Sequence, residues 1–244
     1  MALDVRTFPT RREMGAAAAA QAACVLRAAL AEAPVVRAVF AAAPSQAEML
    51  DALSSHELDW SRVEAFHMDE YVGLPADVPQ RFGPWLERHL FRRVPFRAVH
   101  LLRPDEGVEA CCAAYAALLE AAPLHLVCLG IGVNGHLAFN DPPVADLADT
   151  LDVKRVELDP ACRQQQVDDG AFAALDDVPQ EAVTLTIPRL LRAGRLVCTV
   201  PGPAKRPAVQ AALHGPIGAA CPASALRLHG ACSLFLDRDS DPGR

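Results

Sequence analysis

A glycine-rich stretch, 129–142, carries one histidine and one carboxylate within six residues. It follows an apolar run, 124–129, that predicts a buried strand, so the stretch is expected to be the loop at the end of that strand. Histidine is the side chain most easily poised for proton transfer near neutral pH, and His136 and Asp141 lie close together in this loop. Glycines let a backbone turn sharply and approach a ligand closely; those of the loop are Gly130, Gly132 and Gly135. The stretch therefore predicts proton chemistry on a small bound molecule.

A second strand-like run, 62–68, ends in the adjacent carboxylates Asp69 and Glu70. On an extended backbone neighbouring side chains point to opposite faces, so only one of the two faces a given pocket. In open α/β sheets ligands bind beyond the carboxyl ends of the strands. We therefore expect Asp69 to converge with His136 and Asp141 on one substrate.

Apolar strand-like runs alternate with helical stretches along the chain, which predicts right-handed crossovers and a mostly parallel sheet. We expect an α/β fold in which residues 1–244 form a single, doubly wound, Rossmann-like domain with helices on both faces. The least regular segment, 144–180, is expected to form a lid over the site. The expected strands are 35–43, 62–68, 98–102, 124–130, 182–187, 195–200 and 232–237, and the expected helices include 15–30, 47–53, 80–92, 106–121 and 204–213.

The segments 68–74 and 130–140 resemble the two signature motifs of the glucosamine-6-phosphate deaminase/isomerase family, which is related to the 6-phosphogluconolactonases. The resemblance runs in a consistent order from Val35 to about Asp237. It implies conversion of glucosamine-6-phosphate, or galactosamine-6-phosphate, to a ketose 6-phosphate and ammonia. It also implies that Asp69 is the base that moves a proton between C2 and C1, and that His136 assists opening of the sugar ring. No metal or organic cofactor is expected, because a positioned base and hydrogen-bond donors can stabilise the developing oxyanion.

Two positions depart from the family pattern. Asp141 stands where the deaminases usually carry Glu, and Asn134 stands where they usually carry Asp. In the family those two carboxylates orient the histidine. Asn134 can form hydrogen bonds but cannot stabilise an imidazolium by charge, and the shorter Asp141 must approach His136 differently. The departures leave rate, sugar preference and even the reaction open.

The substrate phosphate needs its own binding groups. Ser45 precedes the expected helix 47–53, where it could cap the helix, bind phosphate at the positive end of the dipole, or do both. The resemblance implies two phosphate-binding cations, Lys205 just after a strand and Arg163 in the lid segment. An Arg fork matches phosphate bidentately, whereas Lys acts as a point charge.

Composition limits the partners. A formal charge of −7 over 244 residues argues against a nucleic-acid surface, so the expected partner is a small sugar phosphate, with a homo-oligomer possible. The eight dispersed cysteines show no zinc-type spacing, the first residues lack an export-signal pattern, and reduced thiols in the cytoplasm are expected. The Ala-rich stretch 15–30 contains Gln21 and Arg27, which favours a packed helix over a membrane span, and no membrane association is expected.

Two other functions stay open at this point. A 6-phosphogluconolactonase-type hydrolase typically has Thr after its Gly-His and Asp-Glu-Arg in the first motif, whereas this chain has Leu137 and Tyr71 at those positions. A non-catalytic sugar-phosphate sensor would also use such a domain, although no helix-turn-helix precedes it here. The sequence does not distinguish the glucosamine substrate from its galactosamine epimer.

Overall fold

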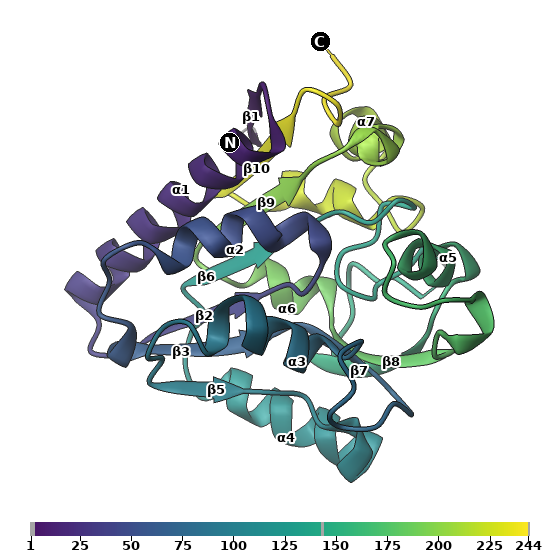
Figure 1. Ribbon diagram of the computed structural model, residues 1–244, viewed down its shortest axis with the longest axis horizontal. Coiled ribbons are helices and arrows are strands. Elements are labelled where there is room, and N and C mark those ends of the chain that lie inside the picture. Colours follow the sequence, from purple (N-terminus) through teal and green to yellow (C-terminus); the bar gives the residue numbers. More distant parts are fainter. Residues whose placement is uncertain (1–2, 143, 244) are drawn as a thin grey trace.

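Parallel strands form the main sheet of the molecule (Figure 1). Across residues 3–142 and 144–243, which the computed structural model describes, seven strands pair in parallel in the order β1-β10-β9-β6-β2-β3-β5. Strands β2, β6, β9 and β10 are buried along their whole length, which explains their near-continuous apolar sequences. The bounds are β1 Asp4–Phe8, β2 Val36–Phe40, β3 Val63–His67, β5 Ala98–His100, β6 Leu126–Leu129, β9 Leu196–Val200 and β10 Cys232–Asp237.

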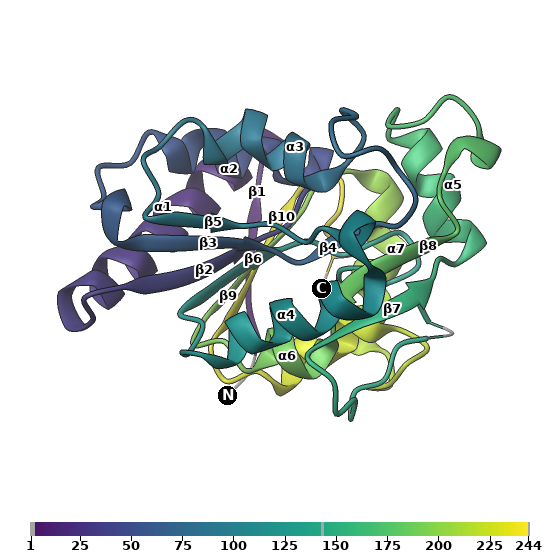
Figure 2. The same cartoon turned by 90° about the horizontal axis from the view of Figure 1, so that it is seen from below.

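Helices cover both faces of this sheet, which confirms the doubly wound arrangement (Figure 2). One hydrophobic cluster joins the sheet to α1, α2 and α3, and the other joins it to α4, α6 and α7. The bounds are α1 Arg11–Glu32, α2 Ala47–Ser54, α3 Phe82–Leu86, α4 Val108–Glu120, α6 Ile187–Leu191 and α7 Arg206–His214. A π-helical turn, Glu87–Phe91, extends α3, so the two together match the helix expected over 80–92.

The Ala-rich helix α1 packs in the core, as predicted. By length and composition alone it would suit a membrane span, but its buried side chains, among them Ala18, Ala22 and Leu26, lie in the cluster that includes β2. Thr10 caps its N-terminus by accepting a hydrogen bond from the Glu13 amide. Small alanine side chains allow close approach of helix and sheet, and Gly15 allows α2 to pass at the first turn, since a Cβ there would lie 2.7 Å from the Cβ of Glu48.

A second sheet, which the sequence did not predict, lies beyond the carboxyl ends of the first. Its antiparallel strands pair in the order β4-β8-β7, and their bounds are β4 Asp69–Tyr71, β7 Val153–Glu157 and β8 Glu181–Leu185. β4 begins two residues after the end of β3, so the chain passes directly from the main sheet into the smaller one. The expected strand 182–187 exists as β8, but it belongs to this antiparallel sheet and not to the parallel one.

The segment 144–180 is more regular than expected. It holds β7 and the helix α5, Pro160–Asp168, followed by a short 3-10 turn at Leu175–Asp177. Asp159 caps α5 by accepting from the Ala161 amide, and Pro160 occupies its first position, where a missing N–H is harmless. This segment lies beside the cavity described below, and Pro143 just before it is outside the described residues.

Candidate active site

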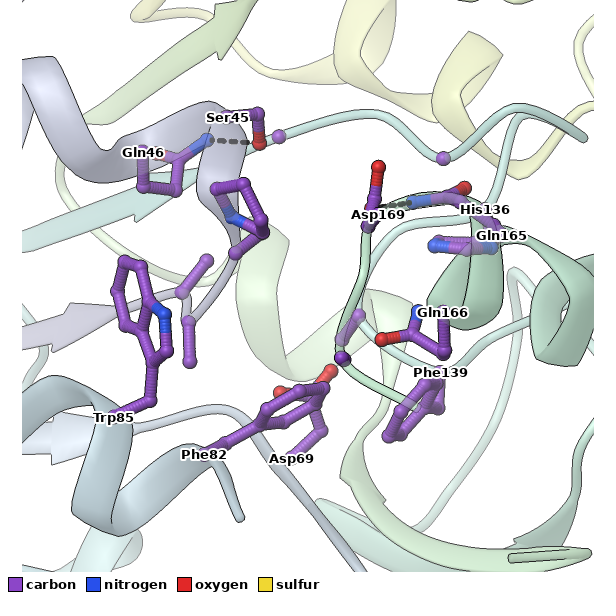
Figure 3. A pocket seen from close by; sticks show the side chains of 18 of the residues that line it. Ser45, Gln46, Asp69, Phe82, Trp85, His136, Phe139, Gln165, Gln166 and Asp169 are labelled. Atoms are coloured by element: carbon purple, nitrogen blue, oxygen red, sulfur yellow. Dashed lines mark hydrogen bonds between the residues drawn. The ribbon is translucent and has the colours of Figure 1, made fainter. Parts of the chain in front are cut away.

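A cavity of about 380 Å³ opens beyond the carboxyl ends of β2, β3, β6 and β9 (Figure 3). The strand order changes direction between β2 and β6, because the chain runs outward from β2 to β3 and β5 on one side and from β6 to β9 and β10 on the other. Such switch points are where open α/β sheets bind ligands. The size is within the range of small-molecule sites. The lining comes from the loops after these strands, from the start of α3 and from the second half of α5 with the residues that follow it.

Asp69 lies at the floor of the cavity with only 6% of its surface exposed. Burial raises its pKa well above the ordinary value, and the negative charges of Glu70 and Asp141 raise it further. A carboxylate with a raised pKa is a better general base near neutral pH. Glu70 points away from the cavity, as the alternation of an extended strand requires, and pairs with Arg81.

His136 and Asp141 form a buried pair on the loop after β6. Nδ1 of His136 lies 2.9 Å from Oδ1 of Asp141, and the same oxygen accepts from Nδ2 of Asn134 at 2.9 Å. Asn134 also accepts from the backbone N–H of His136 at 3.1 Å. Burial alone raises the pKa of Asp141, but His136, Asn134 and the Asp159 amide outweigh it, and the net pKa is lowered. Asp141 is therefore an anionic acceptor that fixes the imidazole.

The glycines of this loop are needed for close approach. A Cβ on Gly132 would overlap the imidazole ring of His136, and one on Gly130 would lie 2.9 Å from Nε2 of Gln46. Gly135 has φ of +86°, a conformation that favours glycine, and Ala138 has φ of +50° beside it on the cavity wall. The loop is thus shaped for the histidine and for the neighbouring serine loop.

The loop after β2 forms the opposite end of the cavity. Ser45 lines it and lies in a 3-10 turn, Pro44–Gln46, that precedes α2. No side chain caps this turn or α2, so the capping role weighed for Ser45 is wrong. Gln46 fixes the loop, because its amide accepts from the Thr199 hydroxyl at 2.8 Å and donates to Ser45 at 3.2 Å. The serine is left facing the cavity.

Lys205 also lines the cavity, in a 3-10 turn just before α7. Burial lowers the pKa of its ammonium to about 8, against the opposing charge of Asp169. Within the described residues it has no ion-pair partner within 4 Å, which leaves the cation available for an anionic ligand.

Arg163 is not brought to the cavity, contrary to the sequence expectation. Its Nη2 donates to the backbone carbonyls of Leu175 at 2.6 Å and Val178 at 2.8 Å, and it does not line the cavity. The guanidinium instead ties α5 to the turn that follows it. No sequence pattern indicates these two carbonyls, because their position depends on how the segment folds back.

Several lining residues were missed. Gln165 and Gln166 of α5 enter the cavity, and Phe82, Trp85 and Phe139 form an apolar wall. The Asp159-Pro160 start of α5 was a readable helix signal, and a helix from there places residues three and four apart on one face. The aromatic wall had no comparable signal in the sequence.

Cys162 of α5 lies next to the His136–Asp141 pair. Possible ligand atoms of these three residues lie within 4.8 Å of one another, which is the geometry of a candidate metal site among the residues that the structure describes. Burial and the nearby Asp141 raise the pKa of the thiol well above its usual value. The sulfur therefore keeps its proton beside Asp141.

The fold and the cavity together define an α/β protein in which a buried carboxylate, a histidine–aspartate pair and a buried lysine line one cavity. The family described as glucosamine-6-phosphate isomerases/6-phosphogluconolactonase matches residues 9–234, and the chain belongs to this family.

Individual relatives agree. A glucosamine-6-phosphate deaminase of Streptomyces avermitilis is 35% identical over 191 residues, which is 76% of this chain and 71% of the relative. The structure of a monomeric glucosamine-6-phosphate deaminase superposes with a TM-score of 0.88 at 25% identity over 98% of both chains. A 6-phosphogluconolactonase from Thermotoga maritima gives a TM-score of 0.79 at 19% identity, over 97% of this chain and 100% of the other, and shares the fold.

Proposed function

We propose that the protein is an amino-sugar-phosphate deaminase/isomerase that converts glucosamine-6-phosphate or its galactosamine epimer to a ketose 6-phosphate and ammonia. One observation carries the proposal: a buried carboxylate with a raised pKa, Asp69, lines the same cavity as His136, with Lys205 available for the phosphate. The names of the deaminase relatives support it.

The phosphate is held by Lys205 and by the serine loop at Ser45. His136, fixed by Asp141 and Asn134, transfers the proton that opens the pyranose ring to the aldehyde. Asp69 removes the proton from C2 and returns it to C1 through an enol-type intermediate, which leaves a C2 imine. Water adds to the imine, ammonia departs, and the ketose phosphate remains. The raised pKa of Asp69 suits both halves of the proton transfer.

Arg163 is left out of this proposal, because its guanidinium is engaged by backbone carbonyls. We propose that the enzyme works in the cytoplasm on the free sugar phosphate, without a nucleic-acid or membrane partner. The free thiols of all eight cysteines and the formal charge of −7 support this setting.

The test is ammonia release from purified protein supplied with glucosamine-6-phosphate, galactosamine-6-phosphate and, separately, 6-phosphogluconolactone. Ammonia from either amino sugar, lost in Asp69→Asn while the variant still binds the sugar, supports the deaminase and identifies its epimer. Hydrolysis of the lactone without ammonia would establish the hydrolase instead. Binding without turnover of any of the three would point to a sensor.

A further inference from the structure

One face of α5 contacts each catalytic segment in turn. Cys162, Gln165 and Gln166 are spaced three and four residues apart, so they share a face, and all three are buried. Cys162 lies against Asp141, and Gln165 accepts from the Val133 amide of the glycine-rich loop at 2.9 Å. Gln166 reaches β4. This face is the part of the lid that the substrate would meet.

The two glutamines differ in how many of their amide groups are already hydrogen-bonded. Gln165 uses both ends of its amide, since its Nε2 also donates to Asp169 at 3.3 Å. Gln166 uses one end: its Oε1 accepts from the Tyr71 hydroxyl at 2.8 Å, while its Nε2 has no partner within the described part of the chain. Because Gln166 is 8% exposed and lines the cavity, this free donor group belongs to the site.

Tyr71 links Gln166 to the strand that carries Asp69. Asp69 and Tyr71 are two residues apart on β4, so their side chains leave the same face with their origins about 7 Å apart. Gln166, bonded to the Tyr71 hydroxyl, lies on the wall of the cavity beside Phe139, with Asp69 below (Figure 3). The Asp69 carboxylate and the amide of Gln166 therefore line the same cavity, one at the strand and the other on α5.

Building on the function proposed above, we propose that Gln166 is a catalytic residue whose Nε2 donates a hydrogen bond to the oxygen on C1 of the opened sugar. Negative charge develops on that oxygen when Asp69 takes the C2 proton. A buried amide held in one orientation by Tyr71 stabilises this charge without reorganising during the reaction.

The experiment measures ammonia release by Gln166→Met, which keeps the side-chain length and removes both polar ends. Loss of one such donor is expected to lower kcat by roughly 10²-fold. Affinity for the open-chain amino-alditol 6-phosphate, which has no carbonyl, should change little. Gln164→Met is the matched control, because Gln164 is on the exposed face of the same helix and should leave both quantities unchanged.

Tyr71→Phe separates chemistry from folding. It frees the amide but keeps the Nε2 donor, so a smaller loss of kcat than in Gln166→Met is expected, and thermal unfolding checks that both variants fold. Unchanged kcat in Gln166→Met, or a loss of alditol affinity as large as the loss of kcat, would overturn the role of Gln166 alone. Wild-type protein that releases no ammonia would overturn the proposed function, and this inference with it.

Discussion

The carboxylate of Glu70 accepts a hydrogen bond from the backbone N–H of Gly83 at 3.0 Å, across the entrance to α3. The same carboxylate accepts from the Phe82 N–H at 3.1 Å and lies 3.4 Å from Nε of Arg81. Phe82 and Trp85 of this helix form the apolar wall of the cavity. Glu70, next to the proposed base on β4, therefore holds this apolar wall in place.

Replacing Glu70 by Gln should change binding and pH dependence together. The amide cannot accept all of these bonds, so α3 should shift and KM should rise. The negative charge of Glu70 is a secondary cause, after burial, of the raised pKa of Asp69, and removing it lowers that pKa. Because the base works when ionised, the acidic limb of the kcat profile should move to lower pH.

The control for this variant is Glu64→Gln. Glu64 also pairs with arginine, at 3.4 Å from Arg37, but it does not line the cavity. A kcat profile in Glu70→Gln that coincides with the profile of Glu64→Gln would show that Glu70 is structural only.

Much of the fold follows from sequence pattern. The buried strands β2, β6 and β9 are continuous apolar runs, and the loops after them carry Ser45, His136 and Lys205 at the expected edge of the sheet. Strand polarity alone brings these loops together, since parallel strands end on the same side. The convergence of Asp69 with His136 was predictable for this reason.

The lid segment was not predictable in the same way. Its strand β7 has only five residues and buries Val153 and Val156 without a regular alternation, and α5 has nine residues, most of them polar or small. β7 pairs with β8, and α5 contacts the loop after β6 through Gln165. Short-range sequence patterns do not encode these contacts. The placements of Arg163 and Gln166 depend on those contacts, so the sequence misplaced one and missed the other.

Replacing Gly132 by Ala should displace His136. The new methyl group would overlap the imidazole, so the ring must leave its position against Asp141. Loss of a positioned acid–base group is expected to lower kcat by roughly 10²-fold or more. Gly218→Ala is the matched control, because nothing lies within 4 Å of a Cβ built there. Near-normal ammonia release by Gly132→Ala would contradict the assigned position of His136.

The charge of Lys205 should set an alkaline limit to substrate binding. Burial lowers its pKa to about 8, so the ammonium loses its proton as the pH rises through that value. Phosphate binding requires the cation, and KM is expected to rise above about pH 8 while kcat changes less. In calorimetry, the proton uptake on binding should grow as the pH rises through about 8. Lys205→Arg keeps its charge, and a KM that rises equally in this variant would argue against Lys205.

Replacing Asn134 by Asp should restore a second carboxylate beside the histidine. The Asn134 amide donates to Asp141 at 2.9 Å, and the change puts two carboxylates in contact there. Their repulsion favours protonated forms of the cluster, so the pH–rate profile should move to higher pH and stability should fall as the pH rises. Asn134→Ala removes the donor without adding charge. A profile shift of the same size in both variants would assign the effect to the lost hydrogen bond.

Replacing Asp69 by Asn should stabilise the protein while it abolishes turnover. Burial, with the charges of Glu70 and Asp141, raises the folded-state pKa of Asp69 above the ordinary value of 3.8, so the folded protein binds this proton more tightly than the unfolded chain. The free energy of unfolding of the wild type therefore falls as the pH rises above about 4, by about 1.4 kcal/mol per pH unit, until the folded-state pKa is passed. Asn has no such dependence, so the gain should grow with pH and then level off. Urea unfolding between pH 4 and pH 8 measures it, with the exposed Asp77→Asn as control. A constant difference across this range would mean that the carboxyl of Asp69 is not held in a raised-pKa state.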